Sequence, residues 1–307
     1  MSIGKVLLVG TISNASSVLE GELNRVLEAL SFFDDVEIFL VESDSTDSTV
    51  EKLQYLAGIN QKFSFMSLGA LTPVLPNRIE RLRHCRNVYV EHIRDRYSNE
   101  SLDYVVAADL DGMNPKISKD GVSSCFNNKI SWDACFSNQL AGYSDIYALR
   151  SKGWQDKDCF VELSEKNSEY INSLGSNMIF RNVRIAFNNN KIRQSVIYSK
   201  MRKIPKTAPW VKVESAFGGL GIYKAEIFFL YNYDKRDVSD VLVSEHVDLH
   251  SKLIDSNLYI NPALINANWN TYNLNKFQLI RYIRVLIRKS SKLRETLKTF
   301  VVWKNHK

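Results

Sequence analysis

Apolar runs alternate with amphipathic segments over the first 110 residues of the chain. Four runs have the length of a β-strand, at residues 5–9, 36–41, 63–68 and 104–108. Most are continuously apolar, which is typical of parallel strands covered by helices on both faces. Helical spacing between them is found at Leu19, Leu23, Val26, Leu27, Leu30, then at Val50 and Leu53, and finally from about Asn77 to Arg96. The alternation predicts an α/β fold with a mixed sheet flanked by helices.

The pattern becomes irregular after Asp111. Short strand candidates lie at residues 134–137, 146–149, 178–180 and 216–223. Residues 187–212 combine three consecutive asparagines, many basic residues and two prolines. This composition predicts a mobile loop.

Composition places the chain among ordinary globular proteins, because 45% of its residues are hydrophobic and 24% are charged. No run approaches the roughly 18 apolar residues that a membrane-spanning helix needs, and the first residues have no signal-peptide profile. We therefore expect a cytoplasmic protein. The four cysteines lack CxxC spacing, which argues against a zinc knuckle or a disulfide framework and predicts reduced, buried thiols.

The positive charge is concentrated at one end of the chain. Residues 276–307 contain ten Lys and Arg and one acidic residue, so this segment carries +9 and the other 275 residues carry −3. Apolar residues recur among these bases at helical spacing, including Phe277, Ile280, Ile283 and Ile287. The pattern predicts a folded domain at 1–275 and a basic amphipathic tail at 276–307 that binds an anionic membrane surface. A tail docked on the body or used in dimerisation is the alternative.

Two carboxylates follow the fourth strand directly, at Asp109 and Asp111. Ligands bind at the carboxyl ends of strands in open α/β sheets, where residues 11–13 and 42–47 are also expected. Paired carboxylates are ligands that Mg²⁺ and Mn²⁺ prefer. The sequence therefore predicts a divalent-cation site at this edge of the sheet. A second such pair, Asp156 and Asp158, is interpreted as a surface turn.

The long basic helix offers guanidinium groups. Arg78 and Arg81, or Arg83 and Arg86, share a helix face at this spacing and could bind a phosphate or a sugar. A solvated basic face is an equally weighted alternative. Asn87 interrupts the pattern, which indicates a polar task for its side chain.

Two acids and two imidazoles lie close together in residues 244–250. His246 and His250 share a helix face, but no further Cys or His cluster completes a zinc site. We predict that Glu245 acts near the reacting carbon and that one histidine is a third ligand of the Asp109–Asp111 metal; a structural role for each histidine is about as probable. The glycines of residues 217–223 do not form a phosphate loop and are expected to allow close approach of the backbone to a sugar.

Six short segments in this order resemble the capsule-associated α-1,3-mannosyltransferases of fungi and their bacterial relatives, within the GT-A glycosyltransferases. They are residues 42–49, 78–82 with 86–87, 109–111, 143–150, 217–220 and 244–245, and they span about two thirds of the chain. Each is short, so only the ordered set is specific.

The resemblance implies a GT-A fold of the Rossmann-like, nucleotide-sugar-binding type, with a donor-binding half at 1–111 and an acceptor half at 112–275. It implies a divalent metal, a donor such as GDP-mannose and transfer with retention. The residues that it assigns to the nucleoside are Glu42 and Asp44, and those near the sugars are Asp145 and Glu245. We add Thr11, Arg78, Arg86, Asn87 and Asp109 as candidate donor contacts. A basic tail in place of a membrane anchor favours bacterial surface-glycan assembly, such as capsule or lipopolysaccharide synthesis.

The main hypothesis is transfer of a hexose to a glycan or glycolipid acceptor at the inner face of a membrane. An inverting enzyme that uses a UDP-sugar, with Glu245 as general base, is the alternative within enzymes. A module that binds anionic surfaces or nucleic acid is the alternative outside them. The acidic body and the apolar residues of the tail favour a membrane surface over nucleic acid.

Overall fold

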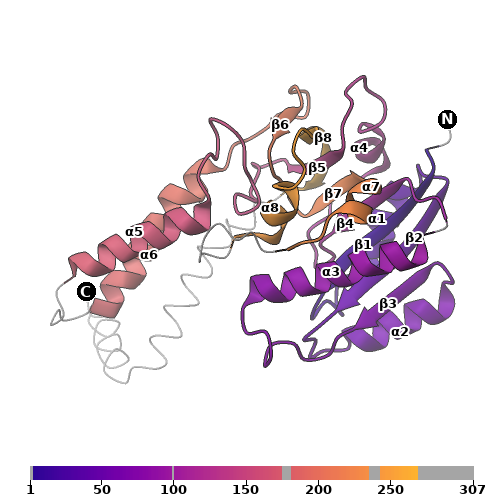
Figure 1. Cartoon of the computed structure of the whole chain (residues 1–307), viewed down its shortest axis with the longest axis horizontal. Helices are drawn as coiled ribbons and strands as arrows, with labels where there is room; N and C mark the ends of the chain where they lie inside the picture. Colours follow the sequence, from indigo (N-terminus) through magenta and orange to yellow (C-terminus); the bar gives the residue numbers. More distant parts are fainter. Residues whose placement is uncertain (1–2, 99, 175–180, 235–242, 269–307) are drawn as a thin grey trace, which may run out of the picture. The chain divides into compact units, whose positions relative to one another are not determined.

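A computed structural model describes residues 3–98, 100–174, 181–234 and 243–268. In this part of the chain, eight strands form one sheet in the order β3-β2-β1-β4-β7-β5-β8-β6 (Figure 1). The strands are β1 (Lys5–Ile12), β2 (Asp35–Glu42), β3 (Phe63–Ser67), β4 (Tyr104–Ala108), β5 (Ala134–Gln139), β6 (Val211–Val213), β7 (Leu220–Lys224) and β8 (Leu258–Ala267). The mixed sheet flanked by helices is the predicted fold class, which is confirmed.

Strands β1 to β4 form the parallel half of the sheet, and their carboxyl ends lie at one edge. Ile12 at the end of β1 pairs with Glu42 at the end of β2, and Val9 pairs with Ala107 of β4. Core side chains on these strands, such as Val6, Leu8, Leu40 and Val106, are fully buried. The four predicted strands are confirmed, and in β1, β2 and β4 burial produces the apolar runs seen in the sequence, whereas β3 is a partly exposed edge strand.

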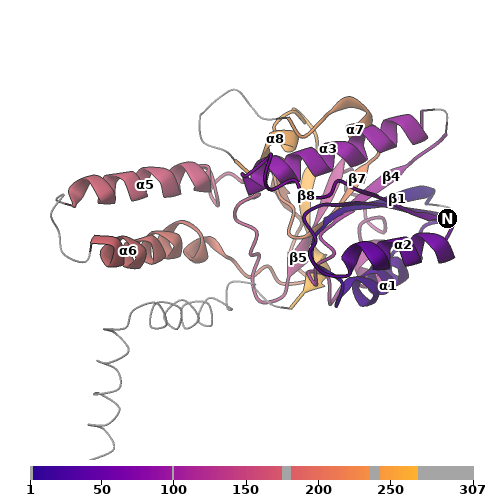
Figure 2. The same cartoon turned by 90° about the horizontal axis from the view of Figure 1, so that it is seen from below.

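Helices cover both faces of this half (Figure 2). Helices α1 (Leu19–Leu30) and α2 (Thr49–Ile59) contribute Leu23, Val26 and Leu53 to the core on one face. Helix α3 (Arg78–Arg96) covers the other face, where the His92 ring stacks on Phe39 with centroids 3.7 Å apart. The three predicted helices are confirmed, and Asn77 caps α3 by accepting a hydrogen bond of 2.9 Å from the Ile79 N–H.

The second half of the sheet is built around β7, which runs antiparallel to both β4 and β5. Strand β8 is parallel to β5, and β6 pairs with β8 at the edge. The shorter helices are α4 (Lys119–Ser123), α7 (Glu226–Leu230) and α8 (Glu245–His250), with the 3-10 turn η1 (Tyr198–Lys200). The chain therefore returns to β4 through β7, which brings residues 217–224 beside the end of the parallel half.

Several predictions for this half are wrong. Residues 187–212 are not one long loop, because α6 (Arg181–Val196) packs against α5 (Cys159–Ser173) to form a helical hairpin beside the sheet. Residues 146–149 form a turn although Ile146 and Leu149 are fully buried. The strand predicted at 216–223 begins only at Leu220, because Gly218 and Gly219 have positive φ angles of 73° and 92°.

Other predictions fall on residues outside the described part of the chain. These are the strand at 178–180, the boundary at 275 and the basic tail at 276–307. Within the described part, no helix is both long and apolar enough to cross a membrane. All four cysteines are buried and free of disulfides, as predicted.

Candidate functional site

Asp109 lies immediately after β4, where loops from the two halves of the sheet meet. Its N–H donates to the Gly219 carbonyl over 2.9 Å, and its own carbonyl accepts from the Asn114 side chain over 2.6 Å. Asn114 is fully buried and is tied in turn to Asn266 on β8. The backbone at Asp109 is thus fixed from both sides, and Asp111 follows two residues later with an exposed side chain.

Arg86 reaches this edge from α3 and contacts two acids. Its Nε donates to Glu245 Oε1 over 3.0 Å, and its Nη2 lies 3.5 Å from Asp109 Oδ1. Only 3% of the Arg86 side chain is exposed, and the guanidinium lies over the Phe217 and Tyr233 rings at 5.2 and 5.8 Å from their centroids. Arg86 was predicted as a donor contact, but its burial and its two carboxylate partners indicate that it positions Glu245 beside Asp109.

Asp145 is held by backbone N–H groups on the other side of the cluster. Its Oδ2 accepts from the Gly218 N–H over 3.0 Å, and its Oδ1 accepts from the Ala148 N–H over 3.3 Å. A side chain at Gly218 would place its Cβ 2.8 Å from Gln139 Nε2, so only glycine fits this turn. The glycines of this segment therefore serve to hold Asp145, a task that the sequence analysis did not assign to them.

The site carries more negative than positive charge. Burial, together with the carboxylates of Asp111, Asp145 and Glu245, raises the pKa of Asp109 to about 7 against the opposing charge of Arg86. The neighbouring carboxylates act on the pKa of Asp109 although 35% of its side chain is exposed. Burial also raises the pKa of Asp145, with a smaller contribution from Glu245. A cation beside Asp109 would relieve this repulsion.

The donor set fits a divalent cation that completes its shell with other ligands. Asp109 and Asp111 supply hard carboxylate oxygens, and the raised pKa of Asp109 indicates excess negative charge. Within the described residues, no group of three or more His, Cys, Asp or Glu side chains is arranged to hold a metal. The two aspartates would therefore share an ion with oxygens of a bound substrate or with water.

The two histidines differ sharply in their surroundings. Both ring nitrogens of His250 are engaged, with Ser215 Oγ at 2.9 Å and Tyr223 Oη at 3.1 Å. His250 therefore has no nitrogen available for a metal, and its prediction as a ligand is at odds with this geometry. His246 stacks on Phe217 with ring centroids 3.8 Å apart, and neither of its nitrogens has a hydrogen-bond partner among the described residues.

The predicted nucleoside contacts follow β1 and β2. Thr11 is half-buried in β1, one residue before its end. The Glu42 carboxylate is buried and accepts from the Ser45 N–H over 2.9 Å and from the Ser67 hydroxyl, so it holds its own loop in place. A nucleoside contact through Glu42 would have to replace these bonds.

Asp44 has a positive φ of 59° and accepts from the Thr72 N–H over 2.8 Å. Burial acts to raise its pKa, but the Thr72 hydrogen bonds and the charge of Arg81 outweigh it and hold the pKa below its usual value. Asp44 is therefore ionised and fixed at this edge of the sheet.

The remaining basic residues and Asn87 take structural positions. Arg78 is exposed at the start of α3. Arg83 Nη2 lies 2.6 Å from Asp248 Oδ2, and the Asn87 side chain accepts from the Tyr233 N–H over 2.8 Å. The Asn87 oxygen is thus already bonded to the loop that contains Tyr233. A contact between the same oxygen and the donor substrate is therefore unfavourable. The second acidic pair is also structural, because Asp158 caps α5 and pairs with Arg150.

Aromatic residues that the sequence analysis did not single out surround the cluster. Tyr143 Oη accepts from the Phe217 N–H over 3.1 Å, and the hydroxyls of Tyr89 and Tyr233 lie 2.7 Å apart. Tyr89 follows Arg86 by three residues and therefore shares its helix face, which is the one signal that could have identified it. Tyr233 has no comparable signal.

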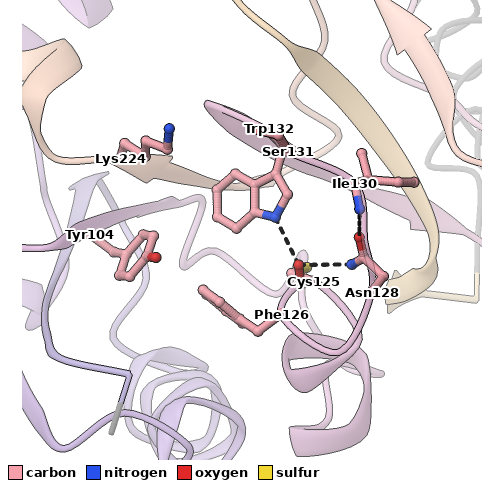
Figure 3. Close-up of a pocket in the computed structure, with 8 residues that line it drawn as sticks. All are labelled: Tyr104, Cys125, Phe126, Asn128, Ile130, Ser131, Trp132 and Lys224. Carbon is pink, nitrogen blue, oxygen red and sulfur yellow. Dashed lines mark hydrogen bonds between the residues drawn. The ribbon is translucent and has the colours of Figure 1, made fainter. Parts of the chain in front are cut away.

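A shallow pocket lies near Tyr104 at the start of β4, at the other end of this strand from Asp109 (Figure 3). Its volume is about 210 Å³, and the rings of Tyr104, Phe126 and Trp132 line it with centroids 5.2 to 5.8 Å apart. The Trp132 N–H and the Asn128 amide both donate to the Cys125 carbonyl. These polar groups stabilise the loop, and the pocket shares no residue with the carboxylate cluster.

The sequence matches no protein-family profile and no curated protein. Among solved structures, a mannosyltransferase from Pyrobaculum calidifontis, determined with GDP-Man and Mn²⁺, has 13% identity and a TM-score of 0.46 over 86% of this chain and 56% of its own. TarS of S. aureus has 11% identity and a TM-score of 0.41 over 94% of this chain and 66% of its own. Glucosyl-3-phosphoglycerate synthase of Mycobacterium tuberculosis, determined with Mn²⁺, UDP and phosphoglyceric acid, has 11% identity and a TM-score of 0.34 over 73% of this chain and 56% of its own.

The chain thus spans between about half and two thirds of the length of these three structures. Similarity of this degree assigns no activity to the chain, so the function has to be argued from its own residues.

Proposed function

We propose that the chain is a glycosyltransferase that uses a nucleotide-sugar donor and a divalent cation. The observation that carries the proposal is the group of four acids, Asp109, Asp111, Asp145 and Glu245, gathered beyond the carboxyl end of β4, where the buried Arg86 guanidinium contacts Asp109 and Glu245. The strand order β3-β2-β1-β4 beside this group is that of nucleotide-binding α/β sheets, in which ligands bind at this edge.

In the proposed mechanism, Asp109 and Asp111 would hold Mn²⁺ or Mg²⁺. Such an ion, when bound, neutralises charge on a diphosphate leaving group. Asp44 and Thr11, which follow or end the neighbouring strands, would face the nucleoside. Glu245 is oriented by Arg86 and Asp145 by the Gly218 N–H, so both carboxylates are fixed before a sugar arrives.

The finer assignment rests on the ordered segments that resemble the α-1,3-mannosyltransferases. It specifies a GT-A enzyme that transfers mannose from GDP-mannose with retention to a lipid-linked or oligosaccharide acceptor in surface-glycan synthesis. An inverting enzyme that uses a UDP-sugar is favoured instead if Glu245 abstracts the acceptor proton. The hydrogen bond from Arg86 fixes the orientation of the Glu245 carboxylate in either case.

The deciding experiment is a screen of nucleotide sugars with Mn²⁺, in which release of the nucleoside diphosphate is measured. We expect one donor to be hydrolysed slowly without acceptor, and we expect the rate to fall to background in excess EDTA. Donors should include GDP-mannose and UDP-hexoses. Binding of none of them in calorimetry would refute the proposal.

A further inference from the structure

His246 is a buried polar side chain that has no hydrogen-bond partner among the described residues. Only 3% of the residue is exposed, and neither Nδ1 nor Nε2 has a hydrogen-bond partner within the described part of the chain. A buried nitrogen left without a partner costs about 1 to 3 kcal/mol. The neighbouring His250, on the same helix, has both nitrogens bonded. The unpaired state of His246 is thus specific to this position.

The ring is held rigidly at the candidate site. It stacks on Phe217, meets the Tyr233 ring edge-on at 5.8 Å, and has its Nε2 3.9 Å from Glu245 Oε1. Phe217 precedes Gly218, whose N–H holds Asp145. His246 is therefore fixed beside Glu245 and against the turn whose Gly218 N–H holds Asp145.

Burial, with the charge of Arg86 nearby, keeps the ring neutral. Burial lowers the pKa of His246 well below its usual value, and the charge of Arg86 and the neighbouring His250 ring lower it further. The field that disfavours a proton on this ring also disfavours a metal ion. A neutral imidazole offers one N–H donor and one acceptor nitrogen. This pair complements a hydroxyl group, which both accepts and donates, and it offers no charge to a phosphate.

We infer that His246 is a substrate-recognition residue that hydrogen-bonds a sugar hydroxyl at the reacting centre. The inference rests on the proposed function and deepens it. The rings of Phe217 and Tyr233 hold the imidazole in place, and His246 would select the position of the hydroxyl. The hydroxyl belongs either to the donor sugar or to the acceptor, which share this chemistry.

The test compares His246→Phe with His246→Asn in the full-length protein. Phenylalanine keeps the stacking on Phe217 and removes both nitrogens, so its melting temperature should equal or exceed that of the wild type. We expect kcat/KM for transfer to fall about tenfold or more, since one hydrogen bond to a substrate is lost. Asparagine restores a donor and an acceptor and should recover part of the activity. The matched control His250→Phe should melt at a lower temperature, because it leaves Ser215 and Tyr223 unpaired.

Separate binding measurements distinguish the two sources of the hydroxyl. Weaker binding of the intact nucleotide sugar, with unchanged binding of the nucleoside diphosphate, identifies the donor sugar. A higher KM for the acceptor alone identifies the acceptor. Wild-type kinetics in His246→Phe, or a loss of Mn²⁺ affinity in calorimetry, would overturn the inference. If the wild type neither binds nor hydrolyses any nucleotide sugar, the proposed function fails. If the wild type is active and His246→Phe is equally active, the proposed function stands and only the inference about His246 fails.

Discussion

Arg86 and Glu245 form a buried ion pair across 159 residues of sequence, with Arg86 Nε 3.0 Å from Glu245 Oε1. Less than a tenth of either side chain is exposed, so each charge depends on the other for its partner. Arg86 also approaches Asp109, which makes it the one described cation in direct contact with this acidic group.

The pair should behave as a unit in stability measurements. Arg86→Met removes the guanidinium and leaves Glu245 buried and unpaired, which should reduce the free energy of unfolding by about 3 to 5 kcal/mol. Adding Glu245→Gln to Arg86→Met should recover part of this loss, since the second change removes the unpaired charge. Urea unfolding of the two single variants and the double variant measures the coupling. Purely additive effects would show that the contact contributes little.

Glu245→Gln should abolish transfer and leave nucleotide-sugar affinity within a few-fold of the wild type. The amide keeps the shape of the side chain but cannot act as a base or carry charge at the reacting centre. Calorimetry with the donor and single-turnover transfer measure the two effects separately. A large loss of donor affinity would assign Glu245 to binding.

Asp111→Asn should reduce the rate by about 10² to 10⁴, because an amide supplies no charge to a divalent cation. Asp156→Asn is the matched control. Asp156 lies in a surface turn and accepts from the Gly153 N–H over 2.8 Å, a bond that an asparagine oxygen can also accept. The control should therefore retain nearly full activity. Steady-state rates at saturating Mn²⁺ decide the matter, and full activity of Asp111→Asn would exclude a metal at this position.

Asp109 should make the metal-free protein less stable as the pH rises. Its folded pKa of about 7 lies above the ordinary aspartate value of 3.8, so the unfolded chain releases this proton at lower pH than the folded chain does. The contribution of Asp109 to stability is fully present below about pH 3.8 and is lost as the pH rises toward 7. Asp109→Asn should remove this loss, so its melting temperature should exceed that of the wild type increasingly between pH 4 and 7 in EDTA. A difference independent of pH would contradict the raised pKa.

Deletion of residues 276–307 should abolish binding to anionic liposomes and leave donor hydrolysis in solution unchanged. The prediction follows from the +9 charge and the apolar residues of this segment, where each base near an anionic surface contributes about 1 kcal/mol. Co-sedimentation at low salt, with neutral liposomes as control, measures it. Equal sedimentation of the truncated and full-length proteins would refute a membrane role for the tail.

The parallel half of the sheet was predictable because β1, β2 and β4 are largely buried and its helices carry regular apolar spacing. The second half was not, and α6 illustrates the reason. Its Asn-rich sequence disfavours a helix, but Ile192 and Val196 are buried one turn apart, so tertiary packing overrides local propensity. Similarly, Ile146 and Leu149 are buried without belonging to a strand.

The candidate site was predictable as a set of segments but not as a set of contacts. Residues 86, 109, 145, 217–219 and 245 were all identified from short motifs, and the structure brings them together. The partners of Arg86, by contrast, depend on the position of α8 beside α3, which no local pattern encodes. The engagement of both His250 nitrogens and the lack of partners for His246 likewise follow from tertiary packing.

The insertion of β7 between β4 and β5 also affects the timing of site assembly during synthesis. Arg86 leaves the ribosome 159 residues before Glu245, a delay of roughly 8 to 30 seconds at about 5 to 20 residues per second. Until β7 has paired with β4, the Asp109 N–H lacks the Gly219 carbonyl, and until α8 has been synthesised the guanidinium lacks Glu245. A nascent chain that ends after β4 therefore carries the two aspartates without their support. Full organisation of the acidic cluster is a late event that coincides with closure of the sheet.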